Sequence, residues 1–202
     1  MASADGPEPP TPGSPPGTIP EATAARQPLS RGQVLFVLAP GVALAGALLG
    51  IPGSIVQEAF ADPLAVFFAG PMIEEATKPA GLYLLLAFRP EYLTGRLQAA
   101  ALASGAGAAF GLIESAIYVN VYVEDPTPEY VAFRFTVPVA LHVVASFIFG
   151  LGITPRLRAS VAGTVPFLSG SWPFFVAAVV LHSGYNITVT VLEIFTEAFS
   201  SF

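Results

Sequence analysis

Residues 64–88 read LAVFFAGPMIEEATKPAGLYLLLAF, an apolar segment whose charged side chains are Glu74, Glu75 and Lys78 near its middle. A helix needs about 20 apolar residues to cross the ~30 Å hydrocarbon core of a bilayer. A charge at the centre of a spanning helix costs about 2.5–3.5 kcal/mol on insertion scales, so intramembrane charges mark functional sites by default. The segment therefore predicts a transmembrane helix that carries part of a functional site.

The composition of the whole chain indicates an integral membrane protein. Of its 202 residues, 53% are hydrophobic and 11% are charged, and the mean hydropathy is +0.67, well outside the range of soluble domains. Cysteine is absent, which excludes disulfides, a thiol nucleophile and a cysteine metal site. The net charge of -6 includes carboxylates that we expect inside the membrane, so it does not indicate a basic partner. No feature indicates nucleic-acid binding.

Four further apolar runs of similar length are separated by connections rich in Pro, Gly and charged residues. Together the runs predict an all-α, polytopic transmembrane helix bundle of about five spans, at residues 33–51, 64–88, 98–122, 131–152 and 172–195. Residues 1–32 contain eight prolines and no periodic apolar face, which is typical of a disordered tail and not of a cleaved signal peptide. We therefore predict a disordered tail at residues 1–32 and a transmembrane domain at residues 33–202.

The charges in the connections predict the orientation of the bundle. Arginines precede the first span, join the second to the third, and join the fourth to the fifth: Arg26, Arg31, Arg89, Arg96, Arg156 and Arg158. The other connections are mainly acidic, although Arg134 lies slightly inside the fourth span. Because positive residues are retained on the cytoplasmic side, we expect a multi-pass protein of the cell membrane with a cytoplasmic N-terminus and an external C-terminus.

Polar residues from four spans lie at one level in this orientation, about 12–20 Å below the outer surface at ~1.5 Å rise per residue. They are Glu74, Glu114, His142, His182 and Asn186. An i, i+4 spacing, which places two residues on one helix face, pairs Glu74 with Lys78, Phe110 with Glu114, and His182 with Asn186. We therefore expect these faces to point at a common centre. The alternative is a structural cluster that only joins helices by hydrogen bonds.

The same residues resemble the motifs of a known superfamily. EEATK at residues 74–78 matches the EExxK/R motif of the intramembrane glutamic proteases, which are grouped with the type II CAAX prenyl endopeptidases and bacteriocin-processing enzymes. FGLIE at 110–114 and HVVASFIFG at 142–150 are similar to PrsW segments, and HSGYN at 182–186 matches the final HxxxN/D motif. The motifs occur in the right order, with Ser115 where the PrsW pattern usually has Asn. The chain thus resembles the PrsW-like proteases.

The resemblance implies an intramembrane endopeptidase that hydrolyses a membrane-embedded or membrane-adjacent peptide bond without a cofactor. It assigns the general base to Glu74, with Glu75 and Glu114 shaping the site or sharing the proton, and the oxyanion donors to His182 and Asn186. It adds His142 to the catalytic group, with Lys78 and Phe110 in support. It also implies a single-span regulatory protein as substrate, such as an anti-sigma factor, while prenylated or bacteriocin peptides remain alternatives.

Three other functions remain open from the residues. A metalloprotease would use His142, His182 and a glutamate as zinc ligands, although the HExxH motif is absent. A proton- or ion-coupled transporter would also place carboxylates and histidines at mid-depth, but the sequence lacks the internal repeats common in transporters. A non-catalytic membrane scaffold or chaperone would keep the fold without the reaction.

Two glycines in the third span predict a close helix contact. Gly107 and Gly111 form a GxxxG pattern within AALASGAGAAFG, and such patterns let two helix backbones approach closely in a membrane. We expect tight packing of this span against a neighbour, with room for a substrate as the alternative.

Overall fold

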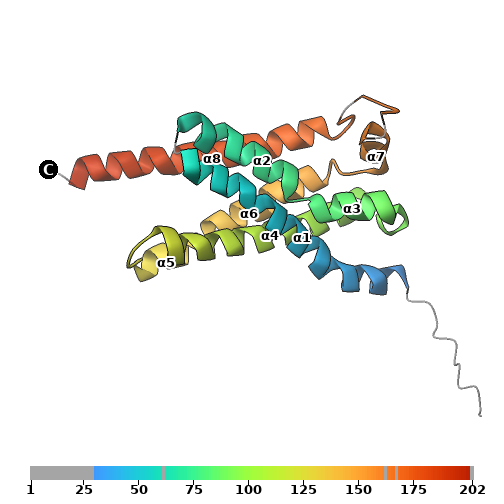
Figure 1. Cartoon of the computed structure of the whole chain (residues 1–202), viewed down its shortest axis with the longest axis horizontal. Helices are drawn as coiled ribbons and strands as arrows, with labels where there is room; N and C mark the ends of the chain where they lie inside the picture. The colour runs from blue at the N-terminus through green and yellow to red at the C-terminus, as the bar shows by residue number, and fades with distance from the viewer. Residues whose placement is uncertain (1–29, 61, 162, 167, 201–202) are drawn as a thin grey trace, which may run out of the picture.

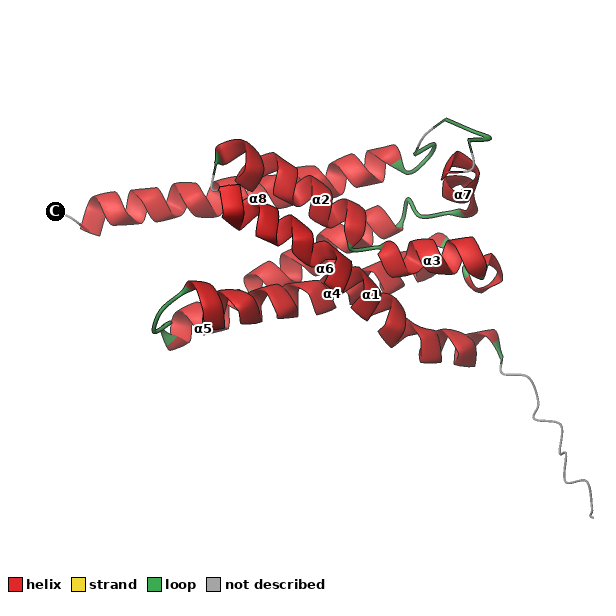
Figure 2. Ribbon diagram, in the orientation of Figure 1, coloured by secondary structure: helices red, strands yellow, loops and turns green. Residues whose placement is uncertain are grey.

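The computed structural model describes residues 30–60, 62–161, 163–166 and 168–200, and within these ranges the chain forms helices and no strands (Figure 2). Of the tail predicted at residues 1–32, residues 1–29 lie outside the described part. The longer helices are α1 (Arg31–Phe60), α4 (Arg96–Ile117), α6 (Val137–Gly150) and α8 (Trp172–Ser200). The shorter α-helices are α2 (Gly70–Thr77), α3 (Ala80–Phe88), α5 (Pro128–Arg134) and α7 (Pro155–Val161). Two π-helices and one 3₁₀ helix complete the set: η1 (Ala65–Ala69), η3 (Tyr118–Tyr122) and η2 (Pro90–Tyr92).

Within the described residues, four stretches of helix are long and apolar enough to cross a membrane: Gly32–Ile55, Arg96–Tyr122, Pro128–Gly150 and Trp172–Phe195. They correspond to four of the five expected spans, so the prediction of an all-α transmembrane bundle is confirmed. The remaining expected span, residues 64–88, is not one continuous helix, because η1, α2 and α3 divide it.

A proline divides the charged segment. Pro79 lies between α2 and α3, and proline has no N–H to donate and crowds the preceding helical turn. The Lys78 N–H still donates to Glu74 O at 2.8 Å, and α3 begins where the Leu82 and Tyr83 N–H groups donate to Pro79 O. The two halves follow one another along the bundle (Figure 1). The break therefore places Glu74 and Glu75 near the end of α2 and Lys78 at its C-cap.

Helix α4 organises the bundle, because it packs against α6 and against α1. Helix α6 also packs against α8, and α8 reaches α2. The α4–α6 contact is close where glycine replaces a side chain: a Cβ on Gly107 would overlap the His142 carbonyl oxygen, and one on Gly111 would lie 2.9 Å from His142 Cδ2. The GxxxG pattern therefore packs α4 against the helix that carries His142.

Gly107→Ala is expected to lower the free energy of unfolding by about 1–3 kcal/mol, the usual cost of overpacking. The added methyl group would force α4 and α6 apart, because it meets the backbone of His142 and lies 2.6 Å from Ser146 Oγ. Denaturation in detergent measures the change. Gly105→Ala is the matched control, since nothing lies within 4 Å of a Cβ at Gly105. Equal effects of the two substitutions would show that this packing contact is unimportant.

Helix α1 also approaches the centre of the bundle through small residues. A Cβ on Gly50 would lie 2.7 Å from Phe110 Cδ2, and one on Gly53 would lie 2.5 Å from Glu74 Cγ. Ser54 follows directly and is buried. The close approach of α1 therefore brings a hydroxyl group to the level of Glu74, which the sequence did not predict.

The connections at the two ends of the bundle differ in charge. The α3–α4 connection and α7 lie at the end where α1 begins, whereas α5 lies at the end where α8 finishes (Figure 1). The first end carries Arg89, Arg96, Arg156 and Arg158, and α5 follows the acidic stretch at 124–129. The arginine-bearing connections therefore lie together at one end of the bundle.

Candidate active site

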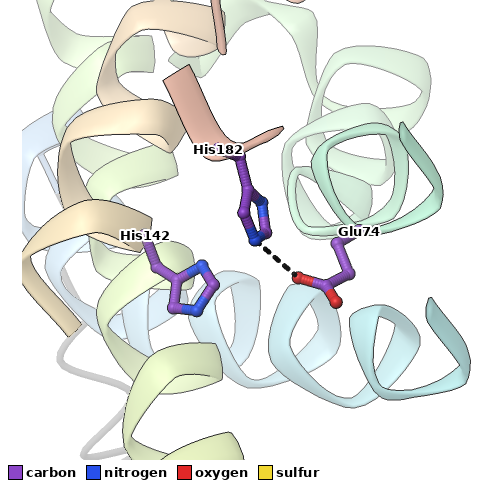
Figure 3. A group of neighbouring side chains, drawn as sticks. All are labelled: Glu74, His142 and His182. Carbon is purple, nitrogen blue, oxygen red and sulfur yellow. Dashed lines mark ion pairs between the residues drawn. The ribbon is translucent and has the colours of Figure 1, made fainter. Parts of the chain in front are cut away.

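Six of the predicted residues meet in one buried cluster between the helices. They are Glu74, Glu75 and Lys78 after η1 and along α2, Glu114 on α4, His142 on α6 and His182 on α8. The three side chains of the α2 segment are 0% exposed. Figure 3 shows Glu74, His142 and His182 pointing toward one another from three different helices. The prediction that these helix faces share a centre is therefore confirmed for Glu74, Lys78, Glu114, His142 and His182, and Glu75 lies there as well.

The Lys78 ammonium group lies inside this cluster. Its Nζ is 2.8 Å from Glu75 Oε1, 3.2 Å from Glu74 Oε2 and 2.8 Å from His142 Nδ1. The Phe110 ring lies 4.3 Å from Nζ, at a distance where the ring face attracts a cation. A buried ammonium requires close partners because removal from water is costly. Lys78 and its two neighbouring carboxylates therefore compensate one another.

The partners of His142 determine which of its ring nitrogens carries the proton. Nδ1 faces the Lys78 ammonium, which only donates, so Nδ1 accepts. Nε2 is 3.0 Å from Glu114 Oε2 and therefore carries the hydrogen that it donates. Both ring nitrogens are engaged in hydrogen bonds, which leaves no nitrogen lone pair of His142 for another ligand.

His182 has the opposite tautomer and a different environment. Its Nδ1 is 2.8 Å from Glu75 Oε1, an acceptor, so Nδ1 carries the hydrogen. Its Nε2 lone pair faces Glu74 Oε2 at 3.8 Å, the pair joined by the dashed line in Figure 3. Glu74 Oε2 has the Lys78 ammonium as an ionic partner at 3.2 Å but makes no further hydrogen bond to the described residues. A donor between Glu74 Oε2 and His182 Nε2, such as a water molecule, would give the His182 lone pair a hydrogen bond.

Ser54 and Arg134 join the cluster, although the sequence analysis did not place them there. Ser54 Oγ is 3.2 Å from Glu74 Oε1 and 3.2 Å from Glu114 Oε1, so it bridges two carboxylates. Arg134 Nη2 is 3.3 Å from Glu114 Oε2. Three carboxylates thus face two cations, Lys78 and Arg134. With neutral histidines, the cluster carries one net negative charge.

Ser115 forms a hydrogen bond with the backbone of Arg134. Its Oγ donates to the Arg134 carbonyl oxygen at 2.6 Å and ties α4 to the end of α5. The Arg134 guanidinium also lies 3.7 Å from the centre of the Tyr118 ring. The residue that stands where PrsW sequences usually have Asn therefore positions the cation that pairs with Glu114.

Asn186 lies at the edge of this arrangement. It follows His182 by one turn on α8 and is half-buried. Its Nδ2 donates to the Val66 carbonyl oxygen of η1 at 3.0 Å. The amide that the sequence analysis assigned to an oxyanion therefore holds α8 against the π-helix in this structure.

Three side chains of the cluster also form a set of potential metal ligands. The ligand atoms of Glu74, His142 and His182 lie within 4.8 Å of one another, and two histidines with a glutamate form a known ligand set of catalytic zinc. The cluster as arranged does not fit a zinc ion, because the Lys78 ammonium contacts two of the three ligands. His142 would have to lose its bond to Lys78 before Nδ1 had a lone pair to offer.

The family comparison covers this whole site. The profile of the family described as PrsW family intramembrane metalloprotease matches residues 31–201. No curated protein and no solved structure matches the chain. The matched range contains every residue of the cluster, together with Ser54, Arg134 and Asn186.

Proposed function

The chain belongs to the PrsW family of intramembrane proteases, and on that basis we propose that Glu74 activates a water molecule to hydrolyse a membrane-embedded or membrane-adjacent peptide bond. The observation that carries this proposal is the facing pair of acceptors, Glu74 Oε2 and His182 Nε2, which lie 3.8 Å apart. A water between them would donate one hydrogen to each. Its oxygen lone pair would then be free to attack a carbonyl carbon.

The proposed reaction has two proton transfers. The water oxygen bonds to the carbonyl carbon while its proton moves to Glu74. Asn186 donates to the resulting oxyanion after its amide leaves the Val66 carbonyl, to which it lies 3.0 Å in this structure. The C–N bond then breaks, and Glu74 returns the proton to the leaving nitrogen. Glu75 holds His182 in the tautomer whose Nε2 accepts from water.

Glu114 and His142 support this reaction from the other side of the cluster. Glu114 accepts hydrogen bonds from His142 Nε2 at 3.0 Å and from Arg134 Nη2 at 3.3 Å. His142 in turn accepts from Lys78 at 2.8 Å. We assign these residues to positioning the Lys78 ammonium and balancing charge, because their donors and acceptors are already used within the cluster.

The family description names a metalloprotease, in which a metal would activate the water. Purified protein in liposomes with candidate single-span substrates separates the two mechanisms. We expect cleavage that persists in EDTA, with the new termini located by mass spectrometry. Cleavage that EDTA abolishes and zinc restores would contradict the glutamate mechanism but keep the protease function. Failure to cleave any candidate would favour a transporter or a scaffold.

An apolar cavity that none of the cluster residues lines offers a place for the substrate. It has a volume of about 760 Å³ and is lined mainly by hydrophobic residues of α3, α6, α7 and α8. Its lining includes Ala76, which follows Glu75, and Tyr83, whose hydroxyl donates to the Ala76 carbonyl at 3.0 Å. Arg158 also lines it. We propose that an apolar segment of a single-span substrate lies in this cavity before cleavage.

Leu84→Trp should lower kcat/KM for a single-span substrate by at least about tenfold, equivalent to ~1.4 kcal/mol. The larger side chain would fill part of the cavity that Leu84 lines. Cleavage rates at varied substrate density in liposomes give kcat/KM, and a thermal melt checks the fold. Leu44→Trp on α1 is the matched control, because Leu44 is 52% exposed against 51% for Leu84 and lies outside the cavity lining. Equal losses in both variants would contradict this placement of the substrate.

We also propose that the N-terminus is cytoplasmic and the C-terminus external. The arginine-bearing connections lie at the end of the bundle where α1 begins (Figure 1), and retention of positive charge in the cytoplasm favours that orientation. Protease accessibility of tags at the two termini, in intact cells and in opened cells, measures the orientation directly.

A further inference from the structure

Lys78 occupies the position that a metal ion would take between its ligands. Two of the three candidate ligands contact its Nζ directly, Glu74 Oε2 at 3.2 Å and His142 Nδ1 at 2.8 Å. The third, His182, is joined to the same ammonium through Glu75 Oε1, which lies 2.8 Å from both Lys78 Nζ and His182 Nδ1. The side chain of Lys78 is completely buried, so it has no exposed alternative position in this arrangement.

The charges of the cluster also favour a single resident cation. Three carboxylates, Glu74, Glu75 and Glu114, face Lys78 and Arg134, which leaves one net negative charge with neutral histidines. A divalent ion beside Lys78 would reverse that sign and place two cations together in a site shielded from water, where like charges repel strongly. Without the ammonium, the same divalent ion would make the cluster neutral.

The remaining geometry would suit a metal if the ammonium were absent. Zinc bonds of ~2.1 Å in a tetrahedral site bring ligand atoms to about 3.4 Å from one another, and the three ligand atoms here lie within 4.8 Å of one another. Metal-binding histidines commonly donate their other ring N–H to a carboxylate. His182 already donates its Nδ1–H to Glu75, which leaves Nε2 free to bind a metal.

We propose that Lys78 excludes divalent metal from this site, and that an uncharged side chain at position 78 converts Glu74, His142 and His182 into a zinc site. We assign the ligand atoms to Glu74 Oε2 and His182 Nε2, which face each other, and to His142 Nδ1, which Lys78 now contacts. This inference bears on the glutamate mechanism of the proposed function, but its test measures metal occupancy and not cleavage.

Metal content of the full-length protein in detergent tests the proposal. Wild type and Lys78→Met are incubated with zinc chloride, desalted and analysed by mass spectrometry of the metal. We expect well under one zinc per chain in wild type and about one in Lys78→Met, consistent with a single three-ligand site. Cobalt in place of zinc should give the visible absorption of a tetrahedral site in the variant only. Zinc should also raise the melting temperature of Lys78→Met, because a ligand that binds the folded state stabilises it.

Three controls make the result specific. Lys78→Arg keeps the positive charge and should remain free of zinc. Lys78→Met/His182→Ala removes one proposed ligand and should lose the zinc that Lys78→Met gains. Arg89→Met removes a cation at the surface, where the Arg89 side chain is 67% exposed, and should bind no more zinc than wild type.

Two outcomes would overturn the proposal. One is stoichiometric zinc in wild type that His142→Ala removes, since Lys78 would then not exclude the metal. The other is that neither Lys78→Met nor Lys78→Ala takes up zinc. This outcome counts against the proposal whether the variants fold and bind no zinc or fail to fold when zinc is present. A cleavage assay has no part in either result, so failure of this inference and failure of the protease proposal remain distinguishable.

Discussion

Glu74→Gln is expected to lower kcat by about 10²–10⁴-fold, the usual loss when a general base is removed. Glutamine has nearly the shape of glutamate and keeps an acceptor for the Ser54 hydroxyl, which lies 3.2 Å from Glu74 Oε1. It cannot take a proton from water. Lys78 loses one partner at 3.2 Å but keeps Glu75 and His142 at 2.8 Å, so the fold should survive. Cleavage of a single-span substrate in liposomes gives kcat and KM, and KM should change little.

The specificity of this loss is tested with two other glutamates. Glu91→Gln is the control, because Glu91 lies outside the cluster and its side chain is 48% exposed, and it should cleave at the wild-type rate. Glu114→Gln should cost far less than Glu74→Gln, since Glu114 already accepts bonds from His142 and Arg134. A Glu114→Gln variant as inactive as Glu74→Gln would show that the two carboxylates share the water. Wild-type cleavage by Glu74→Gln would refute the base assignment.

The members of the cluster could be predicted because helical spacing and depth together restrict where a side chain can lie. Lys78 follows Glu74 by four residues, so their contact at 3.2 Å follows from helix geometry alone. The meeting of side chains from different helices, such as His142 with Glu114 at 3.0 Å, agrees with the shared depth of the motifs. Spacing could not show which ring nitrogen of each histidine is protonated, because that depends on atoms from other helices.

The spacing and depth of the polar residues did not predict that Ser54 and Arg134 join the cluster. Ser54 follows Gly50 and Gly53 on α1, and this small-residue face was a signal in the sequence for close approach to another helix. Arg134 was placed slightly inside the fourth expected span, but no partner was predicted for it. An intramembrane cation usually has a partner, which could have indicated its pairing with Glu114.

The backbone breaks were harder to predict than the side chains. Pro79 was visible within the segment at residues 64–88, but hydropathy alone favoured one continuous helix. The π-helix η1 offers the Val66 carbonyl to Asn186, and such local changes of helical hydrogen bonding have no simple residue pattern. The role of Asn186 therefore depends on a backbone feature that residue spacing does not encode.

His182→Ala is expected to lower kcat by about 10²–10⁴-fold, because it removes the nitrogen that faces Glu74 and would position the water. Glu75→Gln should cost less, about 10–100-fold, the range typical of residues that orient a functional histidine. Glu75 acts through the bond from His182 Nδ1 at 2.8 Å, and glutamine keeps an oxygen there but loses the charge. Both values come from cleavage rates in liposomes.

The double variant Glu75→Gln/His182→Ala distinguishes a shared role from two separate ones. Residues that act as one unit give strongly non-additive losses, so the double variant should be about as active as His182→Ala alone. Melting temperatures of all three proteins must be compared, since Glu75 also pairs with Lys78 at 2.8 Å and its loss reduces the charge compensation of that ammonium. A purely structural Glu75 would lower stability and activity in the same proportion with or without His182. Losses that multiply in the double variant would mean that Glu75 acts on the reaction independently of His182, and the assignment of Glu75 as a positioning residue would then be wrong.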